Sequence, residues 1–235
     1  MTLKIERKVL LSRITSFFAI IIIVSFSFSA KAQTTSKGQI VLTWQARSFY
    51  PADYLLKAPA TTYASVSVSA ELLQNNKLAD LSNANFFWYL DENLFSQGVG
   101  LKEITFKITK LDGDSHFIRV RIKTASGDLE SAISIPITQA EAVIDAPYPQ
   151  NTVKAGSEFS LQAIPYFFSV NSIKDLIFSW EVNSEVAQGG NDNQLTIKLG
   201  TPNYADQRNL SINSSIFNNK NPLELAKTRK SLTIY

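Results

Sequence analysis

Two close pairs of carboxylates are the residues of this chain that could perform acid–base chemistry. Asp91 and Glu92 are adjacent, and Asp112 and Asp114 flank a glycine. Hydrolysis of a glycoside requires two carboxyl groups about 5–10 Å apart across a cleft. Adjacent residues in a hairpin turn point apart and stay in water, and turns favour Asp and Gly. We therefore interpret both pairs as turn residues and predict no catalytic residue.

Metal ligands are scarce in the sequence. Loops that contain Asp112 and Asp114, or the Asn-Asp-Asn triplet at 191–193, offer oxygen ligands for calcium. The first loop lacks the acidic spacing of a calcium loop, and the second has a single carboxylate. The chain has no cysteine and one histidine, so thiolate sites, thiol nucleophiles and imidazole-rich sites are excluded. We expect no metal and no cofactor.

The single histidine, His116, has the same strand parity as Ile118, Val120 and Ile122. This position predicts a capped, partly buried side chain at the outer end of an inward-facing row. No strained turn with a nucleophilic serine accompanies it, so a serine-histidine-acid triad is not expected.

A repeated tryptophan segment is the strongest pattern in the chain. Residues 86–100 read FFWYLDENLFSQGVG and residues 177–190 read IFSWEVNSEVAQGG, which aligns Trp88 with Trp180 at a separation of 92 residues. A repeat of this length, with one tryptophan in a strand of each unit, favours two tandem immunoglobulin-like β-sandwiches. We expect Trp88 and Trp180 to be core markers; stacking on a sugar is the alternative for both.

Two clusters of aromatic residues remain for binding. Phe49, Tyr50 and Tyr54 lie in a proline-containing segment, and residues 166–168 read YFF. Packing between domains is one interpretation, and a contact with a partner protein or a glycan is the other. We take Phe49, Tyr50 and Tyr54 as the expected partner or glycan contact.

The first 32 residues have the pattern of a secretory signal peptide. A basic start is followed by the apolar run Ile14–Phe28 and by Ala30-Lys31-Ala32 before Gln33. An uncleaved membrane anchor is the alternative, although the run is shorter than the roughly 20 residues of a spanning helix. The expected localisation is secreted or at the cell surface, with membrane contact only through this segment if it stays uncleaved.

The positive charge of the whole chain belongs largely to that segment. Residues 1–32 contain 5 of the 23 basic and 1 of the 20 acidic side chains, which leaves 18 − 19, or −1, for the rest. A nucleic-acid-binding protein requires a basic face. We therefore expect no nucleic-acid partner.

Alternating apolar residues predict strands throughout the remaining chain. Examples are Val66 to Leu72, Ile118 to Ile122 and Phe159 to Ala163, with turns such as Asp112-Gly113 between strands. Leu223–Lys227 is expected as a short turn. The expected fold class is all-β: two tandem immunoglobulin-like β-sandwich domains after an N-terminal signal helix, with the signal at 1–32 and the sandwiches at 33–140 and 141–235.

The repeated pattern resembles a known group. Phe-x-Trp-x-x-Asp/Asn followed by Gln-Gly, together with RVRIKTASGDLESAISIPI, resembles bacterial immunoglobulin-like modules, including the PKD-like group. The glycine-rich turn of the PKD-like motif is matched only at its Trp and Asp/Asn. Over residues 39–235 the chain also looks like a family of exported two-domain proteins of small-genome bacteria. No ligand residue follows from this resemblance.

These patterns favour a non-enzymatic exported protein. We expect it to act at the cell surface or envelope through protein–protein contacts, in a structural, adhesive or assembly role. The alternative is a carbohydrate-binding module that uses Phe49, Tyr50 and Tyr54. An enzyme accessory or a hydrolase is a more distant third.

Overall fold

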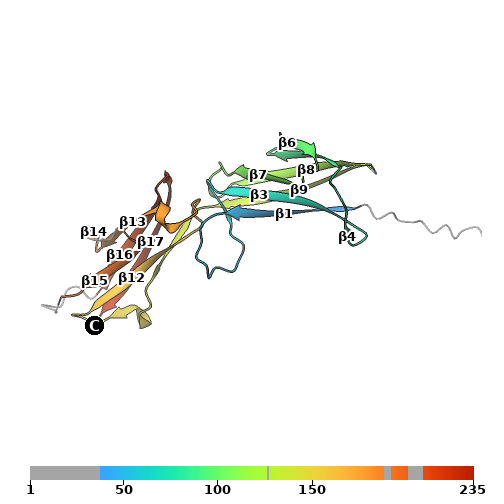
Figure 1. The fold of residues 1–235 in the computed structure, drawn as a ribbon. Coiled ribbons are helices and arrows are strands. Elements are labelled where there is room, and N and C mark those ends of the chain that lie inside the picture. The colour runs from blue at the N-terminus through green and yellow to red at the C-terminus, as the bar shows by residue number, and fades with distance from the viewer. Residues whose placement is uncertain (1–37, 126, 188–191, 201–208) are drawn as a thin grey trace, which may run out of the picture. The chain divides into compact units, whose positions relative to one another are not determined.

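A computed structural model describes residues 38–125, 127–187, 192–200 and 209–235 (Figure 1). The expected signal peptide lies outside these residues, as do Gln188 to Gly190 of the repeated segment and Asn191 of the polar triplet. The described chain consists of mainly antiparallel sheets with two short 3-10 turns, η1 (Pro149–Asn151) and η2 (Ile173–Asp175).

The N-terminal sandwich consists of two sheets. In the first, the central strand β3 (Ser65–Gln74) pairs with three other strands: β1 (Gln39–Arg47), β4 (Lys77–Leu78) and β7 (Glu103–Lys107). The second has the order β2 (Ala60–Thr61), β9 (Gly127–Thr138), β8 (Ser115–Thr124), β5 (Asn85–Leu90) and β6 (Asn93–Val99). Only the β2–β9 pair is parallel in this sandwich.

The C-terminal sandwich repeats this arrangement. One sheet has the order β10 (Glu141–Asp145), β12 (Glu158–Tyr166) and β15 (Gln194–Lys198). The other has the order β11 (Thr152–Val153), β17 (Asn221–Ile234), β16 (Asn209–Asn218), β13 (Leu176–Val182) and β14 (Glu185–Val186). The parallel pair β11–β17 corresponds to β2–β9.

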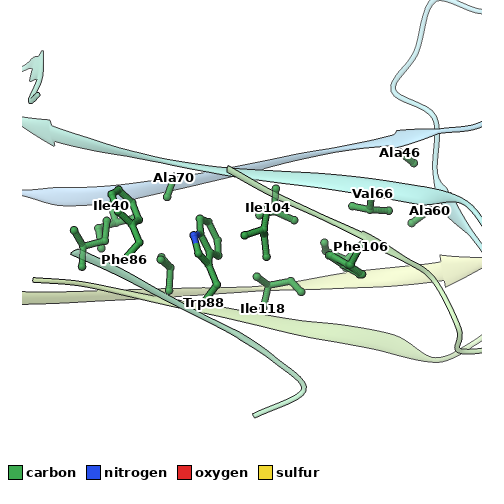
Figure 2. Packing of buried hydrophobic residues seen from close by; sticks show 14 of the residues in the cluster. Ile40, Ala46, Ala60, Val66, Ala70, Phe86, Trp88, Ile104, Phe106 and Ile118 are labelled. Atoms are coloured by element: carbon green, nitrogen blue, oxygen red, sulfur yellow. The ribbon is translucent and has the colours of Figure 1, made fainter. Parts of the chain in front are cut away.

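Alternation along the strands produces the two cores. In β3, Val66, Val68 and Ala70 are fully buried while the serines between them are half-buried. Side chains from both sheets meet around Trp88, as Figure 2 shows. Each buried aliphatic side chain contributes about 1.5–3 kcal/mol relative to an exposed one. A second core forms in the same way around Trp180.

The predicted all-β fold of tandem sandwiches is confirmed. The boundaries at 33–140 and 141–235 stay a prediction, although the two cores draw their residues from Ile40–Ile137 and Ala140–Leu232. The short turn expected at Leu223–Lys227 is wrong, because β17 runs through it from Asn221 to Ile234.

Candidate functional site

The turn between β5 and β6 holds Asp91 in an uncommon backbone conformation. Asp91 has φ +48° and Glu92 has φ +67°. Two consecutive left-handed residues are characteristic of a type I′ hairpin turn, and Asp tolerates this conformation better than most residues. The turn lies against β8, since the Asp91 amide donates to the Phe117 carbonyl at 2.9 Å.

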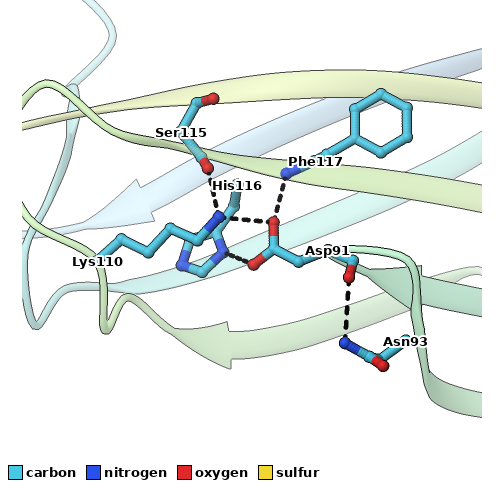
Figure 3. A network of polar contacts seen from close by, with 6 residues as sticks. All are labelled: Asp91, Asn93, Lys110, Ser115, His116 and Phe117. Carbon is cyan, nitrogen blue, oxygen red and sulfur yellow. Dashed lines mark hydrogen bonds and ion pairs between the residues drawn. The ribbon is translucent and has the colours of Figure 1, made fainter.

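The Asp91 carboxylate gathers three donors, which we call the turn network (Figure 3). Its Oδ1 accepts from Lys110 Nζ at 2.9 Å and from the Phe117 amide at 3.0 Å, and its Oδ2 lies 2.7 Å from His116 Nδ1. Partial desolvation raises the pKa of the Asp91 carboxyl. The Phe117 amide, Lys110 and His116 outweigh it, so this pKa lies below its usual range.

His116 lies at the inner end of the turn network. Its side chain is 3% exposed, and its ring meets Phe106 edge to face at 5.4 Å. Its Nε2 is buried and has no hydrogen-bond partner among the described residues. The ring therefore faces the core through Nε2, away from any substrate. We infer a structural role for Asp91 and His116.

The sequence predicted that the Asp91 side chain is solvated, whereas in the structure it is partly buried and hydrogen-bonded. The left-handed turn directs its side chain back onto β8, where it is 31% exposed. Glu92, the next residue, does stay exposed and reaches Arg119 at 3.3 Å. Asp112 and Asp114 are exposed turn residues around Gly113, which has φ +87°.

The second sandwich repeats the turn without the charge. Asn183 has φ +51°, and its amide donates to the Ser211 carbonyl at 2.8 Å. The Ser211 amide in turn donates to Asn183 Oδ1 at 2.9 Å. The alignment of Asp91 with Asn183 thus has a physical cause: each side chain accepts a hydrogen bond from a backbone amide of the neighbouring strand in its sheet.

Trp88 and Trp180 occupy equivalent sites in the two cores. They are 0% and 1% exposed. The indole of Trp88 donates to the Leu101 carbonyl at 2.8 Å, and that of Trp180 donates to the Asp192 carbonyl at 2.9 Å. Neither ring offers a face to a ligand. Their paired donors explain why the sequence uses tryptophan, a large apolar group with one N–H, at both places.

Residues 48–59 connect β1 to β2 and cross from one sheet to the other; we call them the crossing segment. Phe49 pairs with Phe168 through amide–carbonyl hydrogen bonds, Phe49 N to Phe168 O at 2.7 Å and Phe167 N to Phe49 O at 2.6 Å. Tyr54 packs on Phe167 at 5.2 Å and on Tyr50 at 5.4 Å. The role of Phe49, Tyr50 and Tyr54 as a partner or glycan contact stays a prediction, and Tyr50 is the one that lines a cavity.

That cavity, of about 660 Å³, lies between the crossing segment and the strands β1, β3 and β7. Lys57 of the segment places its ammonium 3.3 Å from the centre of the Trp44 ring. Burial lowers the pKa of Lys57. This cation–π contact, which the sequence did not indicate, holds the segment against β1.

A buried carboxylate in the second sandwich was also missed. Glu224 is 5% exposed; its Oε1 accepts from Ser169 N at 2.6 Å, and its Oε2 from Ser169 Oγ at 2.7 Å and Asn218 Nδ2 at 2.5 Å. Three donors satisfy the charge, so the group is structural. It fixes the β16–β17 hairpin to the chain that follows β12.

Strand β6 is an edge with unusual composition. Its sequence, NLFSQGV, contains no charged residue and no proline. Leu94, Phe95 and Val99 are 53%, 43% and 63% exposed. In the described chain β6 pairs only with β5. An uncovered apolar edge of this kind is suited to pairing with another strand.

Two classes of site are absent from the described residues. Within 38–125, 127–187, 192–200 and 209–235, no group of three or more His, Cys, Asp or Glu side chains is arranged to hold a metal ion. The same residues include no helix long and apolar enough to cross a membrane.

No family model and no curated protein matches the chain. Among solved structures it is similar to three N-terminal domains of the highly immunogenic outer capsid protein (Hoc) of bacteriophage RB49, at 13% identity and a TM-score of 0.47, over 84% of this chain and 59% of that chain. It is also similar to fibronectin(III)-like modules of CbhA from Clostridium thermocellum, at 14% identity and a TM-score of 0.29, over 83% of this chain and 93% of that chain. A third similar structure is a tandem of titin Ig domains, at 11% identity and a TM-score of 0.29, over 84% of this chain and 98% of that chain. Because these TM-scores are below 0.5, the sandwich fold is assigned from the sheets and cores of the chain itself.

Proposed function

We propose that this chain is an exported protein of the cell surface or envelope that acts without catalysis, through protein–protein contacts. Its role is structural, adhesive or in assembly, and its sandwiches are of the bacterial PKD-like kind that the sequence resembles. The observation that carries the proposal is the edge strand β6, with its exposed apolar side chains and uncharged sequence.

An uncovered edge strand recruits a partner through its backbone. Its free N–H and C=O groups hydrogen-bond with an added strand, and side-chain contacts add specificity. Soluble proteins ordinarily protect such an edge with charge, proline or a bulge that twists it away. β6 has one register shift, opposite Trp88/Tyr89, and neither a charge nor a proline. The partner therefore contributes an extended segment.

The direction of the free groups follows from the ladder. Gly100 N donates to Ala84 O at 2.9 Å, and antiparallel ladders alternate bonded and non-bonded pairs. Phe86–Gly98 falls on the bonded positions, so the amides of Gln97 and Val99 point away from β5. These two residues present the docking groups.

Other edges support β6 as the contact. The equivalent edge of the second sandwich, β14, is only two residues long and contains Glu185. On edge strand β1, one backbone carbonyl already has a side-chain partner, since Ser131 Oγ donates to the Ile40 carbonyl at 3.5 Å. Edge strand β7 has a charge at each end, Glu103 and Lys107.

Export rests on residues 1–32, and fractionation of the native host tests it. The full-length chain, tagged at Tyr235, is expected in the envelope or the medium with Gln33 as its first residue. A product that stays in the cytoplasm with its first 32 residues attached contradicts the proposal.

Site-specific photo-crosslinking tests the contact. A photoreactive amino acid replaces Val99 in the full chain expressed in its host, and a matched chain carries it at Val186, which is 75% exposed on β14. We expect one reproducible protein adduct from position 99 and none from 186. Equal adducts from both positions, or no adduct from position 99, would refute the contact.

A further inference from the structure

The two sandwiches differ most at the connection between their first two strands, which provides an internal comparison. The crossing segment between β1 and β2 has 12 residues, 48–59, whereas β10 and β11 are joined by six, 146–151. Both connections move the chain from one sheet to the other. Six residues are sufficient for that purpose, so the longer connection has residues to spare.

The extra residues are hydrogen-bonded to one another, and they roof a cavity. The Tyr54 amide donates to the Pro51 carbonyl at 3.1 Å and its hydroxyl to the Lys57 carbonyl at 3.4 Å. Lys57 then lies over Trp44. The space of about 660 Å³ beneath the segment is within the 300–1,000 Å³ of small-molecule sites.

The floor of the cavity is a layer of hydroxyl groups. Thr43 Oγ1 lies 2.8 Å from Ser69 Oγ, and Ser67 Oγ lies 2.8 Å from Thr105 Oγ1. A hydroxyl donates one hydrogen bond and accepts two, so each pair retains capacity for a ligand. At Ser67 and Ser69, β3 is paired with β1 on one side and β7 on the other. A peptide backbone therefore finds no free ladder here.

The walls supply aromatic and charged groups. Tyr50 and Gln45 line the cavity, and Arg47, Lys57 and Glu103 bring charges of both signs to it. Because two of these side chains are cationic and one is anionic, an anion is the competing ligand. The hydroxyl floor and the aromatic wall fit a ligand that is rich in hydroxyl groups and places an apolar face on an aromatic ring.

We propose that this cavity is a binding site for a neutral saccharide. The ring of Tyr50 takes the C–H face of a sugar residue. Glu103 accepts from its hydroxyl groups, and Gln45 and Lys57 donate to them. The site belongs to the N-terminal sandwich and uses no residue of β6.

The intrinsic fluorescence of the protein reports the site. Of the three tryptophans, Trp88 and Trp180 are buried, and only Trp44 is partly accessible. The purified full chain is titrated with the hexasaccharides of cellulose, xylan, chitin, mannan and starch, with heparin as an anionic probe. Acrylamide quenching of Trp44 and calorimetry are the readouts. We expect saturable binding of one neutral hexasaccharide and protection of Trp44 from quenching.

Three variants decide whether the cavity is responsible. Tyr50→Ala and Glu103→Gln should each weaken binding by about tenfold, the effect of about 1.4 kcal/mol. Leu55→Ala is the matched control, since Leu55 lies on the same segment but is 91% exposed and does not line the cavity. If Tyr50→Ala fails to fold, Glu103→Gln, which exchanges one oxygen for an NH₂ group, carries the test.

Three results would overturn the proposal: no hexasaccharide binds at about 10 mM, only heparin binds, or binding is unchanged in Glu103→Gln. These results are independent of the crosslink at Val99. Failure of the saccharide site and failure of the β6 contact are therefore distinguishable.

Discussion

Replacing Asp91 should destabilise the N-terminal sandwich by an amount that can be worked out contact by contact. Alanine at a left-handed position costs about 1 kcal/mol. Loss of the acceptor leaves the buried His116 Nδ1 unpaired, at about 2 kcal/mol, and removes the Phe117 hydrogen bond, at about 1 kcal/mol. The pair with Lys110, about a third exposed, adds less than about 1 kcal/mol. The total for Asp91→Ala is about 4 kcal/mol.

Asp91→Asn provides a graded control, because the second sandwich has Asn183 in this place. Asparagine tolerates the left-handed turn and keeps an oxygen for the Phe117 amide. It loses the charge that faces Lys110 and exchanges the oxygen that faces His116 Nδ1 for an NH₂ group. We expect a loss of about 1–2 kcal/mol.

Hydrogen exchange measures both losses locally. Peptides from β8 report opening of the N-terminal sandwich, and peptides from β16 serve as the internal reference. The free energy of opening in β8 should fall by about 4 kcal/mol in Asp91→Ala. A loss below about 1 kcal/mol in Asp91→Ala, or equal losses in the two variants, would refute the assignment of the turn network.

The same network predicts a pH dependence. The folded pKa of Asp91 is lowered, so its contribution to stability is fully present above the unfolded pKa of about 3.9 and is lost as pH falls through the folded value. The stability difference between the wild type and Asp91→Asn should therefore shrink below about pH 4. A difference that stays constant down to pH 2 contradicts the cause assigned to this pKa.

Three further outcomes are expected. Trp88→Phe and Trp180→Phe should each lower the free energy of unfolding by about 2–3 kcal/mol in urea denaturation, because each loses a buried hydrogen bond and leaves a cavity; a loss in only one would contradict their equivalence. Glu224→Gln should cost about 2–3 kcal/mol in the same assay, since its NH₂ group meets donors, and an unchanged midpoint would show that the buried charge is not required. In NMR spectra of the protein with dimethylated lysines, the Trp44 ring should shift the methyl groups of Lys57 upfield, and these groups should titrate at a lower pH than those of exposed lysines. The substitution Trp44→Leu should remove the upfield shift.

The fold was predictable because local patterns carry it. Val66 to Leu72 alternate as a half-buried strand must, and the repeat of Trp88 at Trp180 identifies one unit used twice. Strand β17 was harder. Its inward parity includes Glu224 and Lys230, which hides the alternation, and the charge of Glu224 is tolerated only because Ser169 and Asn218 donate to it.

The contacts of the turn network and of the cavity were not predictable from spacing. Asp91 and His116 are 25 residues apart, and they meet only because a left-handed turn directs Asp91 onto β8. Lys57 and Trp44 meet because the crossing segment folds back on β1. Both depend on loop geometry, which hydrophobic periodicity does not encode. The difference in length between the two connections was a sequence-level signal, but it becomes readable only when the strand ends are known.

The most direct test of the central claim, that β6 recruits a protein partner, is the photo-crosslink from position 99 measured in a Gln97→Pro chain. Proline removes the outward amide without touching the β5 ladder, and edge strands tolerate it. The adduct should disappear while the melting temperature changes by only a few degrees. A second variant, Leu94→Lys with Ser96→Lys, should act in the same way by placing charge on the edge. An adduct of undiminished yield in both folded variants would contradict strand addition at β6.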